Sequence, residues 1–127
     1  MEEYFENMTK NNLDSVFAST YQSLLDRSLK ESNELGELLS NVNLDTNSGF
    51  QTDSLSSQFR QVAKLIKMRQ DLGTERAVFL TKTGGWDTHN SFDLDPLFTP
   101  INDALEAFKA EMVAQGVWDD VVVLTVS

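Results

Sequence analysis

The sequence predicts an α/β fold in which a helical N-terminal half is followed by a βαβ unit of a parallel sheet. Residues 77–81 and 121–126 are short apolar runs of strand length. The second run is apolar at almost every position, which is typical of a strand covered on both faces, as in parallel sheets. A segment with helical periodicity lies between the two runs. A strand, a helix and a second strand in this order form a right-handed crossover between parallel strands.

The first region, residues 13 to about 42, has the apolar spacing of an amphipathic helix. Apolar residues recur at three- and four-residue steps and form one stripe. The stripe comprises Leu13, Val16, Phe17, Tyr21, Leu24 and Leu25, and continues less regularly through Leu35, Leu38, Leu39 and Val42. Gly36 lowers the helix propensity of the second half. Two helices with a break near Asn33 are therefore an alternative.

Residues 43–54 predict a loop, because they are rich in Asn, Asp, Ser, Thr and Gly. A further helix follows, for which Asp53 or Ser54 is the expected N-cap and Gly73 the expected residue after the C-cap. Its predicted buried face consists of Leu55, Phe59, Val62, Ala63, Ile66 and Leu72.

The predicted βαβ unit occupies the remainder of the sequence. A glycine-bearing loop leads from the first strand to a helix that begins at about Pro96 or Pro100, ends at Gln115 and is closed by Gly116. Its expected buried side carries Leu97, Ile101, Leu105, Phe108 and Met112. Because parallel strands end at the same edge of a sheet, we expect the loop after Thr81 to lie near the end of the second strand.

We expect one partial domain over residues 1–127, with a helical region and loop at 1–54 and an α-β-loop-α-β core segment at 55–127. The net charge of −10 disfavours nucleic acid and anionic membranes as partners. The absence of cysteine excludes disulfides, thiolate metal sites and cysteine nucleophiles. The sequence contains no apolar run of about 18 residues, so it predicts no membrane-spanning helix. The acidic N-terminus does not resemble a signal peptide, and localisation and oligomeric state stay open.

The segment with most chemical content is residues 83–90, Thr-Gly-Gly-Trp-Asp-Thr-His-Asn, which directly follows the first predicted strand. Loops at the carboxyl ends of parallel strands are where ligands and metals usually bind. In an extended loop, Asp87 and His89 share one side of the backbone and form a partial ligand set for zinc, manganese or iron. Asp93 and Asp95 offer further oxygens nearby.

An alternative interpretation of this loop is turn chemistry alone. Asp87 would then cap a backbone N–H, and His89, the only histidine of the chain, would lie on the surface. For Trp86 the sequence favours packing in the core over stacking on a ligand.

These motifs, taken in order, resemble the DUF1501 family, whose members are grouped with the alkaline phosphatase and sulfatase superfamily. The resemblance rests on the Gly-Gly-Trp-Asp-Thr-His run at 84–89, on Leu-Glu-Ala-Phe at 105–108 and on the segment at 120–127. Residues 59–66 and 69–73 are similar to the part that precedes the family's central strand. The similarity covers residues 55–127 well and the first helices loosely.

The resemblance implies an incomplete alkaline-phosphatase-like domain and a hydrolase acting on a phosphate or sulfate ester, with Asp87 and His89 as metal ligands. The divalent metal, zinc or similar, would bind only where residues outside this chain complete the site. The implied substrate is a small or polymeric anionic ester, and the segment alone is expected to be inactive. The alternatives are a non-catalytic binding module and a vestigial fragment with no activity of its own.

Overall fold

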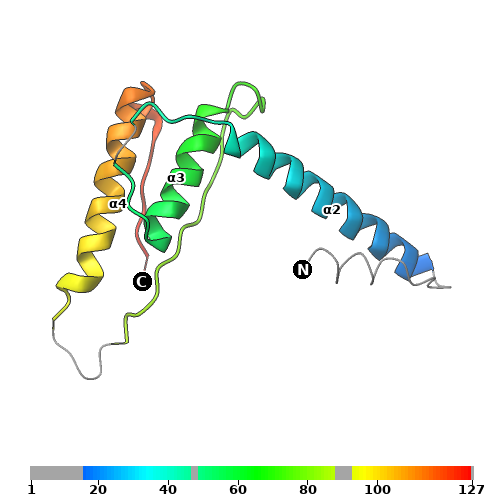
Figure 1. Cartoon of the computed structure of the whole chain (residues 1–127), viewed down its shortest axis with the longest axis horizontal. Helices are drawn as coiled ribbons and strands as arrows, with labels where there is room; N and C mark the ends of the chain where they lie inside the picture. The colour runs from blue at the N-terminus through cyan, green and yellow to red at the C-terminus, as the bar shows by residue number, and fades with distance from the viewer. Residues whose placement is uncertain (1–15, 47–48, 88–92, 127) are drawn as a thin grey trace. The chain divides into compact units, whose positions relative to one another are not determined.

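The computed structural model describes residues 16–46, 49–87 and 93–126. The chain divides into two compact units, Met1–Asn41 and Val42–Ser127, and each is considered by itself. The described helices are α2 (Val16–Ser40) in the first unit, and α3 (Ser54–Lys67), α4 (Asp95–Ala114) and the short 3₁₀ helix η1 (Trp118–Asp120) in the second (Figure 1). None of these helices is long and apolar enough to cross a membrane.

Helix α2 runs without interruption through Asn33. The predicted helix is therefore confirmed, and the alternative with a break near that residue is wrong. Ion pairs one turn apart, Arg27–Glu31 at 2.7 Å and Lys30–Glu34 at 3.8 Å, follow each other along its exposed surface and support the helical conformation. Leu13 of the predicted stripe lies outside the described residues.

Helix α3 begins where the sequence predicts. The carboxylate of Asp53 accepts a hydrogen bond of 3.0 Å from the backbone N–H of Ser56, which confirms Asp53 as the N-cap. The helix ends at Lys67, earlier than predicted, and a series of turns follows. In these turns Gly73 adopts a φ of 62°, and Leu72 is exposed instead of buried.

Helix α4 carries Pro96 in its first turn, where the missing N–H would have no partner within the helix. At its other end Gly116 adopts a φ of 68°, and the N–H of Val117 donates to the carbonyl of Met112 at 3.0 Å. This is the glycine-closed helix end that the sequence predicts.

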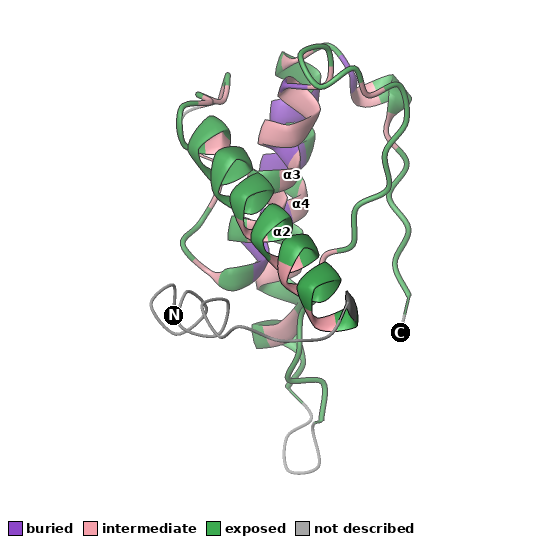
Figure 2. Cartoon of the chain, turned by 90° about the vertical axis from the view of Figure 1, so that its right-hand side faces the viewer, coloured by how far each residue is buried: buried purple, intermediate pink, exposed green. Residues whose placement is uncertain are grey.

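The core of the second unit lies between α3 and α4, where Figure 2 shows the buried residues. Ala63 on α3 packs with Phe108 and Met112 on α4, and Val117 closes the cluster. Partly buried neighbours complete it: Leu44, Phe50, Phe59, Val62, Ile66, Trp118 and Val121. The rings of Phe59 and Phe108 stand 5.1 Å apart with an interplanar angle of 48°, a tilted arrangement that aromatic pairs favour.

The predicted α/β fold with a parallel sheet is wrong, because the regular elements of the described residues are helices and no β-strand is among them. Residues 77–81 and 121–126 are extended, and Figure 1 shows both running along the α3–α4 pair in the same direction. In the described part of the chain, however, no backbone hydrogen bond joins one segment to the other. A strand exists only as a member of a hydrogen-bonded ladder.

The exposed side chains of the two segments show why the apolar runs were misleading. Val78 and Leu80 are 99% and 79% exposed, and Val122 and Leu124 are 93% and 82% exposed. The sequence predicts that the strand at 121–126 is buried on both faces, whereas each segment has at most one face against the helices. The apolar composition is that of a strand, but the described residues supply no ladder partner.

The core predicts a clear stability difference between two substitutions on α4. Replacing Phe108, which is almost fully buried, with alanine should lower the free energy of unfolding by about 3–5 kcal/mol, because a large aromatic side chain leaves a cavity. The control is Val113→Ala on the exposed side of the same helix, where a change within about 0.5 kcal/mol is expected. Urea denaturation followed by circular dichroism measures both; equal losses would contradict this placement of the core.

Candidate functional site

The loop that carries the predicted ligands is anchored to both helices of the second unit. At its start the side-chain amide of Gln58 on α3 makes two hydrogen bonds of 2.9 Å with the backbone of Lys82. The Gln58 Nε2 donates to the Lys82 carbonyl, and the Lys82 N–H donates to Gln58 Oε1. One glutamine thus satisfies both backbone groups of the residue that directly follows the predicted strand.

Beyond this anchor the glycine pair turns the chain toward α4. Gly85 has a φ of 87°, a conformation that residues with a side chain rarely adopt, and it faces Leu97. Trp86 meets Phe98 of α4 edge to face, with ring centroids 5.4 Å apart. Because Trp86 is 45% exposed, the prediction that it packs in the core is wrong.

Of the two predicted metal ligands the structure places one. The side chain of Asp87 is exposed, directly after the anchored turn. His89 lies outside the described residues, so the expected pairing of the two side chains stays a prediction. Of the further oxygens, the Asp93 carboxylate accepts the backbone N–H of Asp95 at 3.2 Å, at the start of α4.

Across residues 16–46, 49–87 and 93–126, no three histidine, aspartate or glutamate side chains are grouped so that they could hold a metal ion. Catalytic zinc typically has three protein ligands and a water. Asp87 with His89 would provide two, so the donor set of this loop does not by itself fit a catalytic metal. Further ligands would have to come from outside the described residues.

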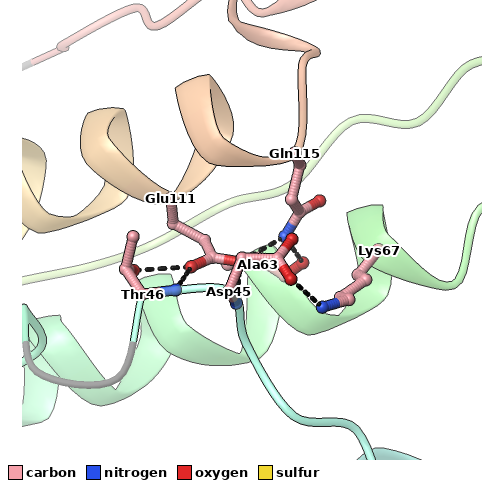
Figure 3. Close-up of polar contacts among 6 residues, drawn as sticks. All are labelled: Asp45, Thr46, Ala63, Lys67, Glu111 and Gln115. Carbon is pink, nitrogen blue, oxygen red and sulfur yellow. Dashed lines mark hydrogen bonds and ion pairs between the residues drawn. The ribbon is translucent and has the colours of Figure 1, made fainter.

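A second polar cluster, centred on Glu111, was not predicted from the sequence (Figure 3). The carboxylate of Glu111 on α4 is fully buried. It accepts the backbone N–H of Asp45 at 3.0 Å, the N–H and hydroxyl of Thr46 at 2.7 and 2.5 Å, and the side-chain amide of Gln115 at 2.7 Å. Lys67, at the end of α3, forms an ion pair of 2.7 Å with the Asp45 carboxylate.

These hydrogen bonds determine the charge of Glu111. Burial on its own raises the pKa of the carboxyl, but the hydrogen bonds from Gln115, Thr46 and the backbone N–H groups outweigh it, and the net shift of the pKa is downward. An ionised carboxylate whose oxygens accept this many hydrogen bonds has a structural role. It joins the loop before α3 to α4, and it is poorly suited to act as a general acid or base.

The sequence did contain a signal for this cluster. Glu111 lies three residues after Phe108 and seven after Ala104, on the same buried stripe of α4. A charged residue on an apolar stripe indicates a buried carboxylate with partners, and this signal could have located the cluster.

The chain has no match among protein-family models, curated proteins or solved structures.

The lowered pKa of Glu111 predicts a pH dependence of stability. The stabilisation is fully present above the carboxyl's unfolded pKa and is lost as the pH falls through the lower folded pKa. At neutral pH, Glu111→Gln should cost about 1–3 kcal/mol, because backbone donors lose a charged acceptor. Urea unfolding from neutral to acidic pH should show this difference shrinking with acidification.

The matched control for this prediction is Glu106→Gln, which removes an exposed carboxylate from the same helix. It should change the free energy of unfolding by less than about 0.5 kcal/mol at every pH. A Glu111→Gln variant with the same stability as the wild type at neutral pH would show that the cluster contributes nothing.

The Gln58 anchor predicts local protection of the loop start. In Gln58→Leu the N–H of Lys82 loses its acceptor, so its hydrogen exchange should accelerate at least tenfold while amides in the middle of α3 keep their rates. Exchange measured by NMR tests this, with Gln61→Leu at an exposed position of the same helix as the control. Unchanged exchange at Lys82 would mean that the anchor does not hold the segment in solution.

Proposed function

We propose that this chain is a segment of a DUF1501-like protein which, when complete, is a metal-dependent hydrolase of phosphate or sulfate esters. Asp87 and His89 would contribute two of the metal ligands. The observation that supports this proposal is the placement of Asp87, exposed at the end of a turn anchored to α3 by Gln58 and to α4 by Trp86.

The chemistry follows from the residue types. A bound divalent metal would neutralise the oxygens of a phosphate or sulfate ester, which are otherwise repelled by a strongly acidic chain. The role of this segment would be to hold two ligands on a short, turned loop. The remaining ligands and the attacking group would be supplied by residues outside this chain.

A second candidate function, a non-catalytic binding module, is favoured by a different observation. The outward side chains of residues 77–81 and 121–126 are apolar and largely exposed. Rows of exposed apolar side chains on extended backbone are typical of surfaces that bind another polypeptide.

The test of the metal proposal is a calorimetric titration of this chain with Zn²⁺ or Mn²⁺. Two ligands should give weak binding, and Asp87→Asn or His89→Ala should each reduce the affinity at least tenfold, about 1.4 kcal/mol. Asp71→Asn, at an exposed position away from the loop, is the control. Equal metal binding by His89→Ala and the wild type would exclude the ligand role and favour the binding module.

A further inference from the structure

The two extended segments at 77–82 and 121–126 present alternating side chains to solvent. In the first, Val78 and Leu80 are 99% and 79% exposed while Phe79 between them is 39% exposed. In the second, Val122 and Leu124 are 93% and 82% exposed while Val123 is 43% exposed. This period of two is that of a β-strand with one face against a core. The opposite face of each segment is apolar and uncovered.

The backbone N–H and C=O groups of these segments have few hydrogen-bond partners among the described residues. Among the described residues, the hydrogen bonds found along 77–82 are the two between the Gln58 side chain and the backbone of Lys82, at the end of the segment. The second segment has one at its start, from the N–H of Val121 to the carbonyl of Trp118. Extended backbone with unpaired N–H and C=O groups is a template for pairing with another strand.

The charged residues that directly adjoin the two segments are complementary in sign, and Glu75 is an acidic neighbour before the first of them. Arg76 and Lys82 stand at the two ends of the first segment, and Asp119 and Asp120 precede the second. All four are exposed, and none forms an ion pair with another residue that the structure describes. An interface built from both segments would therefore match apolar rows with apolar rows, and the acidic start of the second segment with one basic end of the first.

We propose that a second copy of this chain binds here, with residues 77–82 of one copy paired as a strand with residues 121–126 of the other. Among the described residues of one copy, no backbone hydrogen bond joins the two segments, although both lie along the same helix pair (Figure 1). Between copies it is reciprocal, so two ladders form and the assembly closes as a dimer. Because basic residues stand at both ends of the first segment, Asp120 meets Arg76 in a parallel pairing and Lys82 in an antiparallel one.

This inference goes beyond the proposed metal function and does not depend on it. A second copy of the chain would be the partner that binds the exposed apolar surface on which the binding-module candidate rests. The net charge of −10 on each copy opposes association, so the local complementarity at the segment ends has to outweigh a general repulsion. Charge reversals at those ends are therefore sensitive probes of the proposal.

The first experiment is analytical ultracentrifugation of the chain and of Leu80→Lys and Val122→Lys. The wild type should form a dimer with increasing concentration, and each lysine variant should dissociate at least tenfold more readily. Both positions are exposed, so circular dichroism should show unchanged helix content. Val113→Lys, an exposed apolar position on α4, is the matched control and should associate like the wild type.

The second experiment is a charge exchange. Asp120→Lys should weaken association, and a reversed partner should restore it: Arg76→Glu if the strands are parallel, Lys82→Glu if they are antiparallel.

A chain that stays monomeric at all concentrations overturns the proposal. The proposal is also overturned if the Val122→Lys variant still associates while the Tyr21→Lys variant does not, because the contact would then lie on α2. At a concentration at which the wild type is monomeric, metal titration of Val122→Lys should match the wild type, which separates this inference from the ligand proposal.

Discussion

The packing of α3 against α4 is the constraint on which the rest of the second unit depends. Ala63 and Ala104, both fully buried, leave room for the helices to approach, and Phe108 and Met112 fill the space between them. The loop before α3 comes equally close, since a Cβ atom on Gly49 would lie 3.0 Å from the Cβ of Ala107. Dense packing of this kind fixes the positions of the segments that leave the helix ends.

Glu111 connects this packing to the loop. Its carboxylate is buried, yet it carries a charge because four hydrogen-bond donors face it. The backbone N–H groups of residues 45 and 46 would otherwise be unpaired beside an apolar core, which is costly. The carboxylate therefore fixes the loop that brings Leu44 and Phe50 onto the core. The helix pair and its covering loop are thus expected to be lost together in acid-induced unfolding.

Features governed by local chemistry could be predicted from the sequence. The cap at Asp53 and the helix end at Gly116 depend on side chains within a few residues, and both are confirmed. The sheet could not be predicted in this way, because a strand is defined by a pairing partner, and that partner is not restricted to nearby residues or to the same chain. Residues 77–81 and 121–126 have strand composition without that partner. Asp87 could be placed, but its relation to His89 stays a prediction.

The loop that carries Asp87 is the continuation of the first extended segment, so the proposed metal ligand and the proposed dimer contact lie on one piece of backbone. That backbone is held to α3 by Gln58 at one point and to α4 by Trp86 and Phe98, two half-exposed rings. Between these anchors the outward face of the segment is uncovered. A metal ligand must be held within a fraction of an ångström to be useful. Pairing of residues 77–82 with a strand from another copy would add backbone hydrogen bonds immediately before the loop. A covered segment would therefore present Asp87 from a more rigid base than an uncovered one.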